Sequence, residues 1–249
     1  RLLPGMAAAF VDVGLERPAY LFAEDVIAQE DEFFQVWLKG EIDENPPSRR
    51  LPPATISDLL HEGQEVLVQV LRGPTPNKGA RLTTHISLAG HYLVYIPTLT
   101  QLGVSRRIND EPERQRIKAL LEELRPATGG LIARTASQGQ SLEKLTRERD
   151  LLMGIWQRLL GKKDRAPCPS LLHQELEAAR RVVRELYSPE VDRVLVDDPA
   201  AFERIADYLE SLNPLDKYRV ELHAGPEPIF SHFGLEIDWH KLLASRVWL

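Results

Sequence analysis

Cysteine is almost absent from this sequence of 249 residues, and so is any long apolar run. The single cysteine, Cys168, excludes an internal disulfide framework and favours a reducing compartment. No apolar run approaches the roughly 20 residues needed to span a bilayer, and no secretory leader opens the chain. We therefore expect a soluble cytoplasmic protein without a membrane span. Because residue 1 is Arg and the pattern begins abruptly, we also expect a fragment of a longer protein.

The common catalytic patterns are missing as well. The sequence has no glycine-rich phosphate loop, and its seven histidines include no His-x-x-x-His pair. Cys168 and His173 lack partners at triad or zinc spacing. Asp197 and Asp198 are candidates for a metal site, but Asp198 followed by Pro199 is the stronger pattern of a helix N-cap with a first-turn proline. We expect no catalytic residue and no metal site in this chain.

Positive charge is concentrated in the middle of the chain, although the net charge is −6. Residues 101–187 have 17 Lys and Arg against 12 Asp and Glu. Residues 1–60 have 5 Lys and Arg against 11 Asp and Glu, and residues 188–249 have 6 Lys and Arg against 12 Asp and Glu. The net charge argues against unspecific nucleic-acid binding, but the local field is what steers an anionic chain. We expect an anionic ligand to bind the middle segment.

Short strands joined by turns dominate the first third of the sequence. Alternating apolar residues predict strands at 7–13 and 19–22, and again at 65–71 and 80–88 on either side of a hairpin tip. Such a series is typical of a small β-barrel. Residues 42–57 are rich in proline and charge, and they predict an exposed loop.

The remainder alternates strands and helices. The periodicity predicts strands at 91–97, 131–133, 191–198 and 218–225, and helices at 110–124, 141–161, 171–187 and 199–212. The pattern as a whole predicts an α+β chain of several domains.

One of these strands ends in an unusual way. The stretch LIARTASQG, residues 131–139, passes from three apolar residues to Arg134 and Thr135 and then to small residues. Two interpretations remain open on the residues alone. The pair is an ordinary surface strand end, or it forms an oxyanion cradle in which a guanidinium, a hydroxyl and close backbone N–H groups meet an anion.

Three residues of the first strands are candidates for a nucleic-acid contact. Phe10 and Tyr20 lie on adjacent predicted strands, where an exposed pair would stack bases and a buried pair would belong to the core. Lys78 lies at a predicted hairpin tip, where its ammonium is either solvated or meets a phosphate.

Six segments together carry a family resemblance. They are AAAFVDVGLERPAYL, EGQEVLVQV, NKGARLTTHISLAGHYLVYIP, GVSRRI, GLIARTA and GPEPIFSHFGLE. In this order and spacing they resemble the N-terminal half of the bacterial ribonuclease E/G family. The resemblance covers nearly the whole chain and is weakest over residues 28–57, which contain an unfamiliar insertion.

The resemblance implies three domains. Residues 1–83 would form an OB-fold β-barrel of the S-one type that lacks its first strand. Residues 84–180 would form an α/β sensor of RNA 5′ ends, and residues 181–249 an RNase-H-like α/β subdomain with a structural role. The resemblance also implies that the parent protein is an Mg²⁺-dependent, single-strand-specific endoribonuclease of RNA processing and decay. The parent protein would also hold structural Zn²⁺ and form a homo-oligomer.

The family's catalytic carboxylates and zinc-binding cysteines would lie beyond Leu249, so this chain would bind RNA without cutting it. The alternative, from another class, is a stand-alone OB-fold RNA-binding or ribosome-associated protein without hydrolytic activity.

The resemblance also implies site residues. Arg134 and Thr135 match the pair that grips the 5′-monophosphate of RNA, and Gly90 and Val94 match the other wall of that pocket. By the same resemblance, Arg106 would be a further phosphate contact.

Single-stranded RNA would also contact the first domain. By the same resemblance, Phe10 and Tyr20 would stack its bases, and Lys78 would meet its backbone on the same face.

Overall fold

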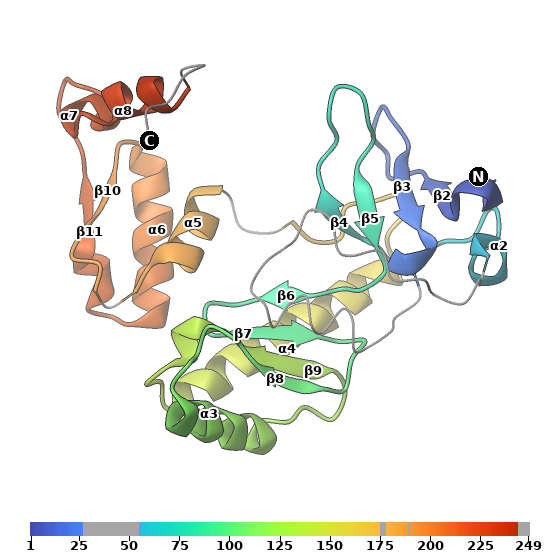
Figure 1. The fold of residues 1–249 in the computed structure, drawn as a ribbon, viewed down its shortest axis with the longest axis horizontal. Helices are drawn as coiled ribbons and strands as arrows, with labels where there is room; N and C mark the ends of the chain where they lie inside the picture. The colour runs from blue at the N-terminus through green and yellow to red at the C-terminus, as the bar shows by residue number, and fades with distance from the viewer. Residues whose placement is uncertain (27–54, 175–177, 189, 244–249) are drawn as a thin grey trace. The chain divides into compact units, whose positions relative to one another are not determined.

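A computed structural model describes residues 1–26, 55–174, 178–188 and 190–243. The chain is a mixed α+β protein with several small sheets, and it divides into two compact units, Arg1–Gln174 and Glu175–Leu249 (Figure 1). The α+β class predicted from the sequence is confirmed, whereas the division into three domains stays a prediction. The unfamiliar insertion and nearly all of the predicted loop at 42–57 lie outside the described residues.

A membrane-crossing helix, which requires both length and an apolar composition, does not occur among the residues that the structure describes.

The first sheet has five strands in the order β1-β2-β3-β5-β4. Their bounds are β1 Leu2–Leu3, β2 Ala8–Val11, β3 Ala19–Phe22, β4 Gln69–Arg72 and β5 Arg81–Thr83. Along β3, Ala19 and Leu21 are buried, whereas Tyr20 and Phe22 are half-buried on the opposite face. This alternation follows from the two-residue period of a strand, and it gives the sheet one core face and one outer face.

The predicted β-barrel, which would lack its first strand, is not closed in the described part of the chain. There, β1 pairs with β2 alone and β4 pairs with β5 alone, so both edges of the sheet stay open. Closure requires the two edge strands to hydrogen-bond to each other. The open sheet is therefore what the structure establishes, and the OB type remains a prediction.

The predicted strand at 80–88 is confirmed only over Arg81–Thr83 and is wrong beyond it, because the chain leaves the sheet after Thr83. The Thr83 hydroxyl donates to the carbonyl oxygen of Asp25 at 3.2 Å, and it accepts from the N–H of His85 at 3.1 Å. The N–H of Thr84 also donates to the Asp25 carbonyl, at 2.9 Å. Side-chain bonds of this kind compete with a strand ladder, and the next strand begins only at Leu88.

The second sheet has four strands in the order β6-β7-β9-β8. Their bounds are β6 Leu88–Ala89, β7 Leu93–Ile96, β8 Leu102–Val104 and β9 Gly130–Ala133. Strands β8 and β9 are parallel, and β7 runs antiparallel to β9. Every residue of β7 and β9 is buried, which shows that both faces of these central strands are covered and explains their continuous apolar sequence.

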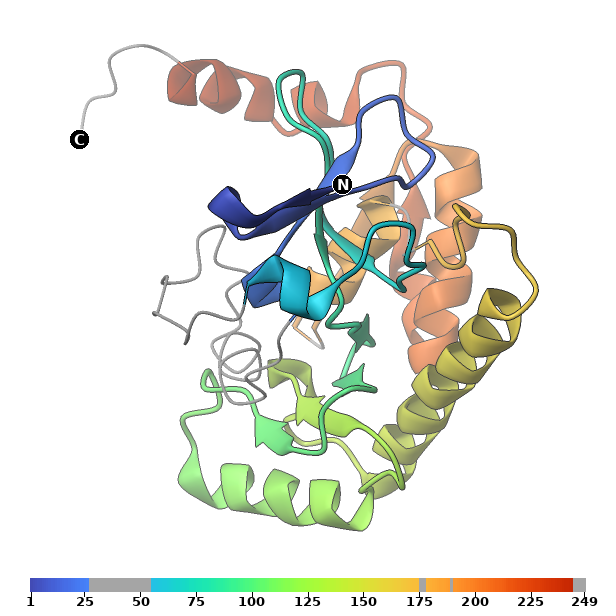
Figure 2. The same cartoon turned by 90° about the vertical axis from the view of Figure 1, so that its right-hand side faces the viewer.

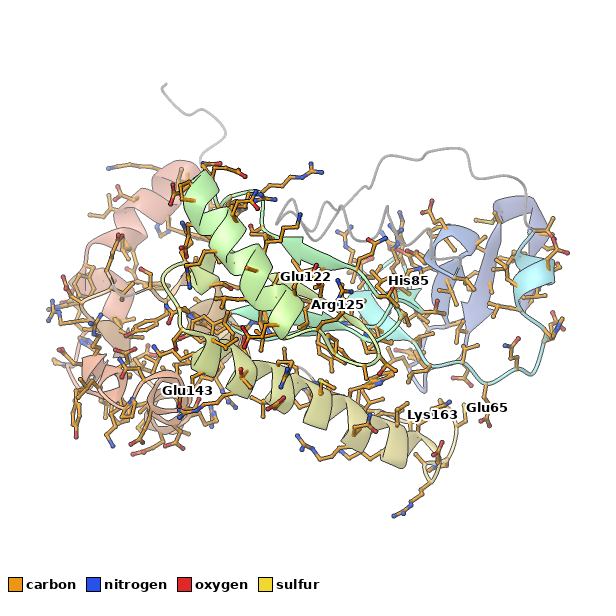
Figure 3. The ribbon with its side chains drawn as sticks, turned by 90° about the horizontal axis from the view of Figure 1, so that it is seen from below. Glu65, His85, Glu122, Arg125, Glu143 and Lys163 are labelled. Atoms are coloured by element: carbon orange, nitrogen blue, oxygen red, sulfur yellow. The ribbon has the colours of Figure 1, made fainter. Side chains whose placement is uncertain are left out.

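Two helices cover this sheet. Helix α3, Glu111–Glu123, connects β8 to β9 and packs on both, and helix α4, Leu142–Lys163, follows β9 and packs on β6 and β7 (Figure 2). In Figure 3, Glu143 and Lys163 mark the two ends of α4. The Ser141 hydroxyl caps α4 by accepting from the N–H of Lys144 at 3.4 Å.

The predicted apolar stripes of α3 and α4 are largely confirmed. Leu145, Leu152 and Leu159 of α4 are buried, whereas Ile155 and Trp156 are half-buried.

On α3, Ile117 and Leu121 are buried, as is Leu124 after its last turn, and Leu120 is half-buried. The 3.6-residue period therefore located the packed faces of both helices.

The second unit contains two parallel strands and the helices around them. Its elements are α5 Ala178–Leu186, β10 Val194–Val196, α6 Pro199–Leu212, β11 Val220–Leu222, α7 Ile229–His232 and α8 Leu235–Leu242. Helix α6 supplies Ile205 and Leu209 to a core that also includes Val196 of β10 and Val220 of β11. As predicted, Asp198 caps α6: its carboxylate accepts from the N–H of Ala201 at 2.7 Å.

Asp198→Ala should lower the free energy of unfolding by about 1 kcal/mol, because α6 loses the acceptor for an unsatisfied N–H of its first turn. Urea denaturation measures this difference. Asp197→Ala is the matched control, since Asp197 is also exposed and lies one residue before the cap. Equal losses in the two variants would contradict the assignment of the cap to Asp198.

Candidate functional site

Three strands of the second sheet begin or end at one edge. Because β8 and β9 are parallel, their carboxyl ends meet there, and antiparallel β7 begins at the same edge. The N–H of Ser105, directly after β8, donates to the carbonyl oxygen of Ala133 at 2.8 Å. The N–H of Arg134, directly after β9, donates to the carbonyl oxygen of Tyr92 at 2.8 Å. Arg134 does lie at a strand end, as the sequence predicted.

Side chains link these strand ends. The Arg134 guanidinium donates from Nη1 to the carbonyl oxygen of Gly90 at 2.7 Å. The hydroxyls of Thr135 and Ser105 share a hydrogen bond at 3.3 Å. Arg134 is half-buried and Thr135 is exposed, as is Arg106 beside Ser105. The structure thus gathers four of the five predicted phosphate ligands at one edge, and it adds Ser105, which the sequence did not single out.

Val94, the fifth predicted residue, lies elsewhere. Its side chain is only 1% exposed and packs in the core with Ile96, Leu99 and Ile132. Val94 therefore has a structural role: it pairs with Ala89 of β6, the residue directly before Gly90.

A buried carboxylate lies behind this edge. Glu148 of α4 accepts from the N–H of His91 at 2.7 Å, of Tyr92 at 2.8 Å and of Leu93 at 2.6 Å. Burial raises the pKa of Glu148, and the three N–H bonds and the positive charge of Arg134 oppose that shift. Sequence reasoning missed Glu148. The signal was a charged residue within the apolar stripe of α4, where burial needs a specific partner.

The loop after Thr135 is anchored by α3. Gly139 adopts a positive φ of 68°, and its N–H donates to the Glu113 carboxylate at 2.8 Å. Arg116 donates to the same carboxylate through Nε at 2.6 Å and Nη2 at 2.7 Å. These bonds lower the pKa of Glu113 to about 2, the bond from Arg116 being the largest cause.

Glu113 should therefore stabilise the fold fully above its unfolded pKa of 4.5 and progressively less as the pH falls towards 2. We expect Glu113→Gln to lower the free energy of unfolding at pH 6, because the charged bonds from Arg116 and Gly139 are lost. The loss should be only about 1 kcal/mol, because solvent screens this exposed pair. The difference between parent and variant should shrink below pH 4.5, as measured by urea denaturation at several pH values. A constant difference over this range would show that the charge of Glu113 contributes nothing.

A second candidate surface is the outer face of the five-stranded sheet. Phe10 of β2 and Tyr20 of β3 are direct cross-strand partners. Phe10 is 41% exposed, so it is not a core residue, and Tyr20 is half-buried. The ring centres of Tyr20 and Phe22 lie 5.3 Å apart in an edge-to-face arrangement. Cζ of Arg81 lies 5.4 Å from the Phe22 ring centre. The side chains of these four residues share the outer face of the sheet, because Phe10 and Arg81 are the cross-strand partners of Tyr20 and Phe22 follows Tyr20 by two residues.

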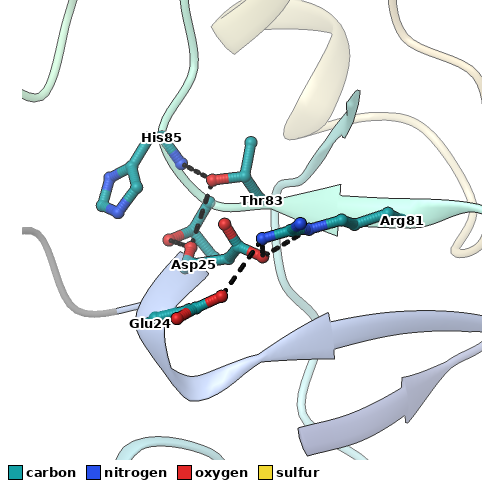
Figure 4. Close-up of polar contacts among 6 residues, drawn as sticks. Glu24, Asp25, Arg81, Thr83 and His85 are labelled. Carbon is teal, nitrogen blue, oxygen red and sulfur yellow. Dashed lines mark hydrogen bonds and ion pairs between the residues drawn. The ribbon is translucent and has the colours of Figure 1, made fainter. Parts of the chain in front are cut away.

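Arg81 is fixed on this surface by two carboxylates (Figure 4). Its Nε donates to Asp25 at 3.1 Å, and its Nη2 donates to Glu24 at 3.2 Å. Burial raises the pKa of Asp25, and the charge of Arg81 opposes the shift. The sequence analysis did not single out Phe22 or Arg81, although Phe22 follows Tyr20 by the two-residue period of a strand.

Lys78 occupies a hairpin tip, as predicted. The tip is closed by bonds between Thr75 and Lys78, in which each N–H donates to the other residue's carbonyl oxygen, at 2.8 and 3.2 Å. Lys78 is exposed. Its contact with a phosphate stays a prediction.

The described residues do not fit a site for Mg²⁺ or Zn²⁺. Among them, no three His, Cys, Asp or Glu side chains gather closely enough to hold an ion. The Asp198 carboxylate is engaged as a helix cap, and Cys168 is exposed.

Comparison with known proteins identifies relatives along the whole chain. The model of the ribonuclease E/G family matches residues 87–249. Ribonuclease G of Haemophilus influenzae is 35% identical over 247 residues, covering 99% of this chain and 48% of that protein. Ribonuclease G of Escherichia coli K12 shows the same identity and coverage. Ribonuclease E of Haemophilus influenzae is 36% identical over 241 residues, or 95% of this chain and 24% of that protein.

The chain spans about half the length of these ribonuclease G proteins. The family match covers well over half of the chain and includes the whole edge that carries Gly90, Ser105 and Arg134. This chain belongs to the ribonuclease E/G family.

Proposed function

We propose that this chain is the RNA-binding part of a single-strand-specific endoribonuclease of RNA processing and decay, and that it senses 5′-monophosphorylated ends. One observation carries the proposal: Gly90, Arg134, Thr135 and Ser105 are joined by hydrogen bonds at a single sheet edge. The family membership supports a ribonuclease role.

The chemistry of this edge suits a compact dianion. A guanidinium offers a planar fork of donors that matches two phosphate oxygens, and a hydroxyl adds a third donor. A triphosphate is bulkier and more highly charged, and we expect it to fit poorly beside Gly90 and Arg134. The excess of Lys and Arg over residues 101–187 attracts the RNA end.

Binding of matched oligoribonucleotides tests the proposal. Two RNAs of one unstructured sequence, one with a 5′-monophosphate and one with a 5′-hydroxyl, are titrated against the chain at fixed salt concentration. We expect tighter binding of the monophosphorylated RNA. Equal affinities would contradict end sensing.

The outer face of β2, β3 and β5 is proposed to bind the single strand, as the OB-fold assignment of this sheet implies. Phe10→Ala and Tyr20→Ala should each weaken binding of either RNA by about 1–3 kcal/mol, because each removes a ring on which a base stacks. Lys78 is proposed to meet the RNA backbone. Tyr218→Ala, which removes a 74% exposed aromatic from the second unit, is the control. Unchanged affinity of the folded Phe10 and Tyr20 variants would contradict the stacking role.

The properties of the whole protein belong to the same proposal and rest on the family alone. They are Mg²⁺-dependent cleavage, structural Zn²⁺, a homo-oligomer and a cytoplasmic location. The chain itself is proposed to bind RNA without cutting it, with Asp198 acting as a helix cap rather than a catalytic group.

A further inference from the structure

The turn before β7 points three consecutive backbone N–H groups at one carboxylate. The N–H of His91 donates to Oε1 of Glu148, and those of Tyr92 and Leu93 donate to Oε2. Successive N–H groups that converge in this way form an anion-binding concavity. Here the protein's own Glu148 side chain fills the concavity and engages all three N–H groups.

Gly90 connects this buried carboxylate to the exposed edge. A Cβ atom at Gly90 would lie 2.5 Å from Cδ of Glu148 and 2.7 and 2.8 Å from its two oxygens, so only glycine lets the carboxylate reach the turn. The carbonyl oxygen of Gly90 accepts from Nη1 of Arg134. Glu148 therefore holds the N–H groups directly after Gly90, while Arg134 is held by the carbonyl of Gly90 itself.

We propose that Glu148 is a positioning residue for the 5′-phosphate site: by fixing the turn Gly90–Leu93, its carboxylate sets the orientation of the Arg134 guanidinium. This inference rests on the proposed function. The opposite charges of Glu148 and Arg134 add to the effect, since the guanidinium is attracted towards the turn that it must contact.

Glu148→Gln tests the inference with little change of shape. Its single carbonyl oxygen can still accept two of the three N–H bonds, whereas its amide NH₂ faces the third N–H and the negative charge is lost. The ratio of affinities for 5′-monophosphorylated and 5′-hydroxyl RNA should fall about tenfold, as loss of one charge-assisted interaction predicts. The affinity for 5′-hydroxyl RNA should stay at the parent value.

Glu143→Gln is the matched control, because Glu143 lies on the same helix but is exposed and pairs with Arg147 (Figure 3). NMR adds a readout without RNA. The amide protons of His91, Tyr92 and Leu93 and the guanidinium protons of Arg134 should shift in Glu148→Gln and keep their parent positions in Glu143→Gln.

The outcomes separate the inference from the proposed function. If the parent chain prefers the monophosphate and Glu148→Gln keeps the full preference, the positioning role is overturned and end sensing stays intact. If the parent chain shows no preference, both the positioning role and end sensing are overturned. If Glu148→Gln does not fold, Glu148→Asp replaces it, since its carboxylate keeps the charge but withdraws from the turn by one methylene. A reduced preference in that variant supports the inference, and an unchanged preference overturns it.

Discussion

Arg134→Lys is expected to weaken binding of 5′-monophosphorylated RNA nearly as much as Arg134→Ala, by on the order of 3 kcal/mol. The reason is the geometry of the guanidinium. Nη1 already holds the carbonyl oxygen of Gly90, and the planar fork allows one side chain to hold that oxygen and a phosphate in different directions. A lysine ammonium keeps the charge but is a single point that cannot satisfy both. Thr135→Val should cost about 1.5–3 kcal/mol, the value of one hydroxyl bond to a charged acceptor.

Affinity measurements with both RNAs distinguish this site from a general basic surface. The losses in Arg134→Lys and Thr135→Val should vanish with 5′-hydroxyl RNA, because that RNA has no terminal phosphate to lose. Arg158→Lys, on the exposed side of α4, is the matched control and should leave both affinities unchanged. If Arg134→Lys binds both RNAs like the parent chain, Arg134 is only a structural strand end and the phosphate site lies elsewhere.

Leu131→Ala is expected to lower the free energy of unfolding by about 2–5 kcal/mol, the usual range for a leucine removed from a packed core. Leu131 is fully buried in β9, where it is paired with Tyr95 of β7 on one side and Leu102 of β8 on the other. The truncation leaves a cavity between the strands whose ends carry Gly90, Ser105 and Arg134.

Urea denaturation of the variant measures this loss. Leu151→Ala on α4 is the control, because Leu151 is 59% exposed and its truncation should change stability by no more than about 0.5 kcal/mol. A loss below about 1 kcal/mol in Leu131→Ala would show that β9 is not at the centre of the core. Under conditions where Leu131→Ala remains folded, it should keep the preference for a 5′-monophosphate, since no ligand-contacting side chain has changed.

Local patterns were sufficient for the three long helices α3, α4 and α6 and for several strands. Helix α6 begins at Pro199 after the Asp198 cap, as predicted, because a cap and a first-turn proline act on neighbouring residues. Strand β3 and helix α3 match their predicted ranges within a residue or two, since alternation and the 3.6-residue period are properties of short segments.

Elements that depend on distant partners were predicted less well. The strand expected at 80–88 ends at Thr83 because Thr83 and Thr84 bond the carbonyl of Asp25, which lies 58 residues before Thr83. Barrel closure likewise depends on the pairing of edge strands that are far apart in the sequence, so short strands joined by turns could indicate a barrel without establishing one.

The same distinction holds at the candidate site. The amino-acid pattern alone places Arg134 and Thr135 after an apolar strand in the positively charged part of the chain. The meeting of Gly90 and Ser105 with them depends on the fold, because parallel and antiparallel pairing brings three strand ends to one edge.

Glu148 shows most clearly why part of the site could not be predicted from the sequence. A carboxylate on a helix is ordinarily solvated, because removing its charge from water is costly. It is buried here because three N–H groups, 55 to 57 residues away in the sequence, converge on it and offset that cost. No local pattern encodes such a convergence. The donors and the acceptor come from separate elements, and only the packing of α4 on β7 brings them together.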